Sequence, residues 1–150
     1  MDLTHVAEND VERERLRSLV TGLGDEELSR PMPAGWTVAA VLAHIGFWDA
    51  RAIFWLDKWE SRVEPSAPDY ETREDVEWIN DSVKPLCLAL PPRDAAQLAL
   101  RLAEEADKRV TALNDEMLAK VQAVGCPFNL SRADHRREHL DDIQRTLSPR

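Results

Sequence analysis

Apolar spacing of three and four residues is the feature that most constrains the fold of this sequence. After Pro91 and Pro92, apolar or small residues recur at Ala96, Ala99, Ala103, Ala106, Val110 and Leu113. This spacing places them on one face of an α-helix. Proline is favoured in the first helical turn, so the two prolines predict where this helix begins. Strand-like alternation is nearly absent from the chain, and an all-α fold is therefore predicted.

Four main helices and one shorter helix are predicted from this spacing and from residues that begin or end helices. The expected ranges are Thr4 to Leu23, Thr37 to Glu60, Glu74 to Leu90, the stretch after Pro91, and Ser131 to Leu147. Thr37 is a favoured N-cap, and Gly24 is expected to end the first helix in the left-handed conformation. Pro85 is expected to kink the shorter helix. The segment from Ser61 to Arg73 is predicted to be a long crossing loop.

Two segments 90 residues apart resemble each other. Residues 21–28 are TGLGDEEL and residues 111–118 are TALNDEML. Each is expected to end a helix at a left-handed Gly or Asn and to continue into a short acidic turn. Two related helix pairs would explain the repeat, since His44 shifted by 90 positions falls one residue short of His135. Chance similarity between two helix ends explains it equally well.

Length and charge restrict the organisation and the partners of the chain. Its 150 residues suit one domain, residues 1–150. The net charge of −9 argues against nucleic acid and against an anionic membrane surface as partners, since both attract basic proteins. No apolar run reaches the roughly 18–20 residues of a membrane helix. The first residues lack the apolar region of a secretory signal, so a cytoplasmic location is expected.

The two cysteines, Cys87 and Cys126, are too few and too far apart for a disulfide framework or a C-x-x-C site. Both are expected to be small buried apolar residues. Cys126 lies nine residues before His135, so a place near a site at that histidine is the alternative.

Three of the four histidines fall where a helical bundle would build a metal site. His44 lies at the edge of the apolar arc of the second helix, beside Val41 and Trp48. His139 lies at the edge of the apolar stripe of the last helix. His135 lies one turn earlier, so both imidazoles are on the same side of that helix. Seams between the helices of a bundle are where metal sites form.

The chemistry of three imidazoles is that of a metal-binding site. Neutral imidazoles suit a divalent ion such as zinc, nickel, copper or iron. Three protein ligands leave coordination positions for water or substrate, whereas a structural site usually has a fourth protein ligand. A single histidine at a helix edge is more often a surface or capping residue, and an H-x-x-x-H pair alone is usually not a metal site. The metal interpretation therefore depends on the three histidines together.

Two charged residues lie on apolar helix faces. Asp49 stands between Ile45 and Ile53, about 140° around the helix from His44. It is therefore expected to pair with another helix rather than to bind the same ion. Arg136 lies within the apolar arc of the last helix and is expected to extend its charge to the surface. The alternative makes Arg136 a weak catalytic candidate that holds an anionic substrate group near the metal.

Residues 135–139 also fit H-x-x-E-H, an inverzincin protease signature in which Glu138 would be the general base. The pattern has only three fixed positions, so chance matches are common. Such a protease also needs a third ligand well downstream, and only eleven residues follow His139. Glu138 is kept as a second weak catalytic candidate.

Three stretches resemble the DinB/YfiT-like superfamily. Residues 35–49, GWTVAAVLAHIGFWD, are similar to its second-helix signature of Trp, a Ser or Thr cap, an apolar stretch, a His-apolar pair and an aromatic-acid pair. Residues 75–80, DVEWIN, resemble a segment that often follows the crossing loop, and residues 134–139, DHRREH, match the late H-x-x-x-H. The resemblance covers nearly the whole chain.

The resemblance implies an up-down-down-up four-helix bundle with one divalent metal ion, often zinc or nickel, in proteins that are frequently homodimers. Carried over by position, the metal ligands are His44, His135 and His139. Some relatives are transferases or isomerases that use low-molecular-weight thiols, and some are hydrolases.

The first functional expectation is a metal-dependent thiol S-transferase or detoxification enzyme that acts on a small-molecule substrate. A metal-bound thiol readily loses its proton and becomes a strong nucleophile. The alternatives are a metal-dependent hydrolase, in which the ion lowers the pKa of a water, and a non-enzymatic metal-binding or interaction bundle.

Overall fold

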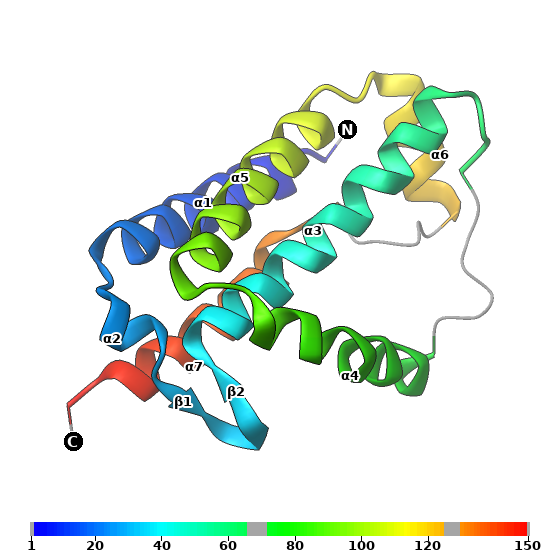
Figure 1. The fold of residues 1–150 in the computed structure, drawn as a ribbon. Helices are drawn as coiled ribbons and strands as arrows, with labels where there is room; N and C mark the ends of the chain where they lie inside the picture. The colour runs from blue at the N-terminus through cyan, green and yellow to red at the C-terminus, as the bar shows by residue number, and fades with distance from the viewer. Residues whose placement is uncertain (1, 66–71, 125–129, 150) are drawn as a thin grey trace.

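The computed structural model describes residues 2–65, 72–124 and 130–149, and most of these residues are helical (Figure 1). The helices are α1 (Thr4–Gly22), α2 (Asp25–Leu28), α3 (Val38–Glu60), α4 (Arg73–Ala89), α5 (Pro92–Thr111), α6 (Asp115–Val124) and α7 (Ala133–Leu147). A short antiparallel hairpin pairs β1 (Pro31–Met32) with β2 (Trp36–Thr37). Apart from this hairpin, the described residues confirm the predicted all-α class.

The central helix is α3. α5 packs along it most extensively, α4 and α7 also contact it, and α1 lies against α5 and α7 (Figure 1). The small residues predicted on one face of α5, from Ala96 to Val110, are buried. By length and apolar composition α3 would be able to cross a membrane, but most of that stretch is buried inside the protein, as in the core helix of a soluble protein.

Two hydrophobic clusters form the core. The larger one joins α1, the first half of α3, α5 and α7, and it includes Leu16, Leu42, Ile45, Ala99 and Leu140. The smaller one joins the second half of α3 to the end of α5 and to α6, and it includes Leu56, Trp59, Val110, Leu118 and Val121. Cys87 is 4% exposed within the larger cluster, as predicted, and burial raises the pKa of its thiol. Cys126 lies outside the described residues.

The predicted helix starts are confirmed where a local signal marks them. The Thr37 hydroxyl accepts a hydrogen bond from the backbone N–H of Ala40 at 3.1 Å and so caps α3. Pro92 is the first residue of α5. α4 runs from Arg73 to Ala89 with Pro85 inside it, so the helix continues through this proline.

The predicted left-handed ends at Gly24 and Asn114 are wrong. Gly24 has φ −86°, and it precedes α2 as the N-cap. The Asn114 side chain accepts the backbone N–H of Met117 at 2.8 Å and thereby caps the start of α6. Both residues therefore begin a helix, and the predicted acidic turn after Asn114 is the ten-residue α6.

The hairpin was not predicted, because two residues per strand give no detectable alternation. Its turn, Pro33–Gly35, contains two left-handed residues, Ala34 at φ 60° and Gly35 at φ 78°. Lys84 of α4 donates a hydrogen bond to the Ala34 carbonyl, and its ammonium lies 5.2 Å from the centre of the Trp36 ring. The hairpin is thereby held against α4, and Trp36 is fixed beside the start of α3.

Close contact between α3 and α5 depends on Gly46. A Cβ atom at this position would lie 3.3 Å from both the Ala99 Cα and the Leu102 Cδ1. We expect Gly46→Val to lower the free energy of unfolding by about 2 kcal/mol, because the added methyl groups force two packed helices apart. Urea unfolding followed by circular dichroism measures this change.

Gly22→Val is the matched control for this prediction. Gly22 is also helical, but a Cβ atom there would meet nothing within 4 Å. The control should change stability by less than about 0.5 kcal/mol. Equal losses in the two variants would show that the α3–α5 contact does not require glycine.

Candidate metal centre

Three histidines from two helices converge at one point. His44 on α3 is buried, and His135 and His139 on α7 are half-buried one turn apart. The His135 Nε2 lies 3.2 Å from the His44 Nε2 and 3.1 Å from the His139 Nε2. One nitrogen from each of the three rings lies within 4.8 Å of the other two. The structure thus brings together the three predicted ligands from two distant parts of the sequence. His44 and His135, whose Nε2 atoms are in contact, are 91 residues apart in the chain.

Burial keeps these imidazoles neutral. Burial, together with the neighbouring His139, lowers the pKa of His44 from 6.5 to about 4 and that of His135 to about 2. Burial also lowers the pKa of His139, against the opposite influence of Glu138 and Asp142. Neutral imidazole is the form that binds a metal, because its unprotonated nitrogen carries the lone pair.

The geometry fits a small divalent ion. Zinc binds histidine nitrogen at about 2.0–2.1 Å in tetrahedral sites, which places two such nitrogens about 3.3 Å apart. The two Nε2 separations, 3.1 and 3.2 Å, are close to that value. The described residues therefore contain a group of three histidines that could hold a metal ion.

Two of the three rings have an Nδ1 atom without a hydrogen-bond partner in the part of the chain that the structure describes. Those of His44 and His135 are buried and have no partner among the described residues. Metal-binding histidines usually donate this second N–H to a carboxylate or carbonyl, which fixes the ring. Here the orientation of the two rings depends instead on aromatic packing and on the placement of α3 and α7.

Two tryptophans form the walls around the histidines. The Trp36 ring, from β2, meets His44 edge-on at 5.6 Å between ring centres, and the Trp48 ring meets His135 at 6.4 Å. The Trp48 Nε1 donates a hydrogen bond to the Asn80 Oδ1 at 2.8 Å and thereby ties α4 to α3. Trp36 and Trp48 thus form part of the wall of the site.

Two pockets open onto the histidines. The larger, about 830 Å³, lies between the hairpin, α4 and the C-terminal end of α7. The smaller, about 490 Å³, lies between α3, α4 and the start of α7. His44, His139, Glu77 and Asn80 line both pockets, so the two spaces meet at the histidines.

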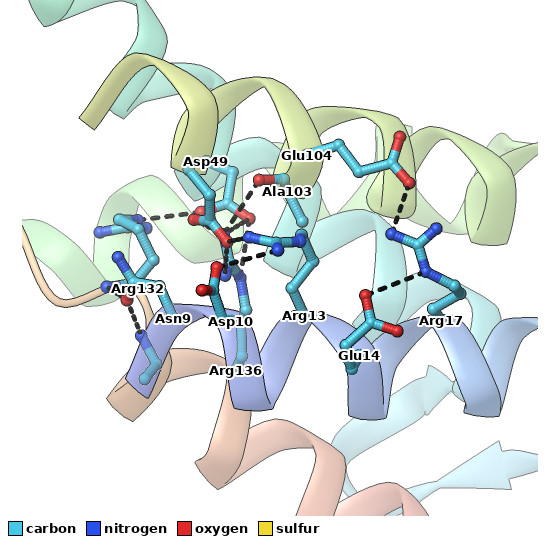
Figure 2. A network of polar contacts seen from close by, with 12 residues as sticks. Asn9, Asp10, Arg13, Glu14, Arg17, Asp49, Ala103, Glu104, Arg132 and Arg136 are labelled. Carbon is cyan, nitrogen blue, oxygen red and sulfur yellow. Dashed lines mark hydrogen bonds and ion pairs between the residues drawn. The ribbon is translucent and has the colours of Figure 1, made fainter. Parts of the chain in front are cut away.

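Asp49 and Arg136 belong to a buried ion network that joins α3 to α7 (Figure 2). The prediction that Asp49 pairs with another helix is confirmed, since it binds Arg136 of α7 and Arg132, the N-cap residue of that helix. The prediction that Arg136 extends to the surface is wrong, because the residue is 0% exposed. Its guanidinium is bonded to Asp49 and Asp107, so its charge is already matched by carboxylates and we assign it no substrate.

Glu138, the other weak catalytic candidate, has an exposed side chain that lines the smaller pocket. It stands on α7 between the two histidines of that helix. His44 supplies the third nitrogen of the cluster, whereas the protease signature would take a ligand from further along the chain.

Sequence reasoning missed two buried polar residues that bind the start of α7 and Arg136. Asn9 and Asp107 are 2% and 3% exposed. Each lies on the buried face of its helix, Asn9 with Leu16 on α1 and Asp107 with Ala103 on α5. A polar residue on an apolar face is the signal that would have found both.

Comparison with known proteins identifies the family of the chain. A family model described as the DinB superfamily matches residues 8–143. No curated protein and no solved structure matches the chain. The family match spans α1 to most of α7 and includes all three clustered histidines. This chain belongs to the DinB superfamily.

Proposed function

We propose that this protein is a divalent-metal-dependent enzyme whose single ion is held by His44, His135 and His139. The observation that carries the proposal is the convergence of three neutral imidazoles beside two pockets. Zinc and nickel are the proposed ions, because both bind neutral imidazole well. Three protein ligands leave positions for a substrate atom, which favours a catalytic role over a structural one.

The proposed reaction is the transfer of a low-molecular-weight thiol to a small electrophile. A divalent ion in this site would act as a Lewis acid and lower the pKa of the thiol that it binds. The larger pocket would hold the reactants, and its volume is in the range of small-molecule sites. Trp36 and Val41 give it an apolar wall, and its charged lining residues are of both signs: Arg30 and Arg145, and Glu77, Asp81 and Asp142.

A metal-dependent hydrolase is the second candidate, supported by the position of Glu138. Its exposed carboxylate lines the same small pocket as the three histidines. A carboxylate at this position would be available to accept a proton from water. This reaction would need no thiol, which separates it from the first candidate.

We further propose that residues 1–150 form one domain, in which α1, α3, α5 and α7 are an up-down-down-up four-helix bundle. The contacts of α3 with α5 and α7, and of α1 with the same two helices, support this arrangement.

The protein is proposed to be a cytoplasmic homodimer. Its net charge of −9 supports the absence of nucleic-acid and membrane partners.

Thiol dependence tests the proposed function. Protein reconstituted with zinc or nickel is mixed with a panel of electrophiles, with and without several low-molecular-weight thiols. We expect metal-dependent loss of an electrophile only when a thiol is present, because the thiol is the nucleophile. Mass spectrometry of the conjugate and the rate of electrophile loss are the measurements.

Metal-free protein is the control in the same assay. Turnover without any thiol would favour the hydrolase. If no electrophile reacts faster than in buffer, with or without thiol, the metal-bound protein is better explained as a non-enzymatic binding or interaction bundle.

A further inference from the structure

The buried ion network joins the two helices that carry the histidines. Asp49 lies on α3, five residues after His44, and its carboxylate oxygens accept from Arg132, the N-cap residue of α7, and from Arg136 within α7 (Figure 2). The Arg132 Nε donates to the Asp49 Oδ1 at 2.9 Å, and the Arg136 Nη2 donates to the Asp49 Oδ2 at 3.1 Å. These arginines stand three residues before and one residue after His135.

The network continues into the other helices of the core. Arg136 donates from both terminal nitrogens to the two oxygens of Asp107 on α5, each at 2.8 Å. Arg13 of α1 donates to the same carboxylate at 2.8 Å. One buried arginine of α7 is therefore bonded to α3 and α5 at once, and α1 joins through Asp107.

The start of α7 is fixed separately by Asn9 of α1. Its Oδ1 accepts the backbone N–H groups of Arg132 at 2.7 Å and of Ala133 at 3.0 Å, and its Nδ2 donates to the Leu130 carbonyl at 3.1 Å. The Arg132 side chain makes no capping bond of its own. A residue distant in sequence thus satisfies the first N–H groups of the helix that carries His135 and His139.

Helix placement decides whether the histidines meet. The Nδ1 atoms of His44 and His135 have no partner among the described residues, so no hydrogen bond at that atom orients either ring. A shift of α7 by one residue would move His135 by about 1.5 Å along the axis and about 100° around it. Either movement would take its Nε2 away from the His44 Nε2, which is 3.2 Å distant.

Buried ion pairs contribute little net stability, because the cost of removing the charges from water offsets much of their attraction. Asp49 and Arg136 are 1% and 0% exposed. The best-attested benefit of such buried polar groups is a specific register between helices. A register-setting role explains why charged residues occupy positions that apolar residues would fill.

We propose that Asp49 is a positioning residue of the metal site, which sets the register of α7 on α3 by binding Arg132 and Arg136. This inference rests on the proposed metal-binding function. Asp49 does not touch the histidine nitrogens; it acts through the two arginines that flank His135.

The test is Asp49→Asn, which keeps the shape of the side chain and removes its charge. Zinc affinity is measured by competition with a chromophoric chelator, and cobalt is added to record the visible absorption spectrum of the bound ion. We expect zinc to bind at least about tenfold more weakly, as for other residues that support metal ligands indirectly. We also expect a changed cobalt spectrum, because displaced imidazoles alter the coordination geometry. General destabilisation would leave the spectrum of the folded fraction unchanged.

Two matched controls separate positioning from charge and from stability. Asp57→Asn removes an exposed carboxylate of α3 that binds Arg109 of α5 and should leave zinc affinity unchanged. Asp107→Asn removes the other carboxylate bound to Arg136, but it leaves Asp49 to join α3 and α7. We expect it to lower stability and to keep the cobalt spectrum. Equal loss of affinity and equal spectral change in Asp49→Asn and Asp107→Asn would overturn the positioning role.

If circular dichroism shows that Asp49→Asn does not fold, the same measurements are made on Arg132→Gln instead. It removes one of the two bonds to Asp49 and leaves the Arg136 bond in place. It should weaken zinc binding and change the cobalt spectrum. If the wild type binds zinc and the folded Asp49→Asn or Arg132→Gln variant has the same zinc affinity and cobalt spectrum, this inference is overturned and the proposed function is not. Wild-type protein that takes up neither zinc nor cobalt would overturn the proposed function and this inference with it.

Discussion

A His135→Ala/His139→Ala double variant is expected to lose essentially all of its divalent-metal binding. The variant keeps one of the three nitrogens that meet at the site. Complete four-ligand zinc sites contribute about 10–16 kcal/mol, or roughly 3 kcal/mol per ligand. Loss of two ligands should therefore weaken binding about 10⁴-fold. Elemental analysis of purified protein and zinc competition titrations measure the effect.

His5→Ala is the matched control for metal binding. It removes a histidine that lies near the start of α1 and outside the cluster, so it should leave the metal content unchanged. The double variant should remain helical by circular dichroism, because neither hydrophobic cluster includes His135 or His139. A folded double variant with about one equivalent of tightly bound metal would show that the ion lies elsewhere, and the three-histidine site would be wrong.

The parts of the fold that were predictable from sequence have local causes. Thr37 caps α3 with its own hydroxyl, and the spacing of small residues on α5 follows from one helix face. The two histidines of α7 lie one turn apart for the same reason. Helical geometry relates such residues without knowledge of the rest of the protein, so the pattern alone was enough.

The parts that were missed depend on contacts between distant segments. Asn9 caps a helix that begins more than 120 residues later, and Asp107 binds Arg136 from a different helix. From the sequence alone, Arg136 was expected either to reach the surface or to bind a substrate group, because its carboxylate partners become neighbours only after folding. The hairpin that carries Trp36 is held by Lys84, which lies 50 residues from its partner Ala34.

Helix ends were misassigned where one residue type serves two roles. Gly and Asn are common both after a helix and before one. At Gly24 and Asn114 the structure uses them before α2 and α6. The choice between the two roles depends on whether the following residues can be buried. Leu118 and Val121 of α6 pack against the end of α3, so a helix forms there.

Acid sensitivity of the metal-free protein is the second large effect that we expect. The pKa of an unfolded histidine is about 6.5, whereas burial lowers the pKa of His44 to about 4 and that of His135 to about 2. Below pH 6.5 the unfolded chain therefore binds protons that the folded protein does not. The stability from these two groups is present above about pH 6.5. As the pH decreases, the share of His44 falls until about pH 4 and that of His135 until about pH 2.

The size of the effect follows from the two lowered pKa values. Between pH 8 and pH 5, we expect each of the two histidines to lower the free energy of unfolding by about 2 kcal/mol, which is about 4 kcal/mol for both. Chemical unfolding of chelator-treated protein between pH 8 and pH 5 measures this loss. Metal must be absent, because a bound ion would compete with protons for the same nitrogens.

A His44→Gln/His135→Gln variant separates these histidines from all other titrating groups. Glutamine is uncharged at every pH, so the variant should lose about 4 kcal/mol less than the wild type between pH 8 and pH 5. Carboxylates contribute equally to both proteins and cancel in the difference, and His139 is present in both. Equal losses in both proteins would mean that the clustered histidines take up protons in the folded state, and neutral imidazoles would then not be the resting form of the site. The predicted difference would instead show that folding alone prepares His44 and His135 to bind a metal at mildly acid pH.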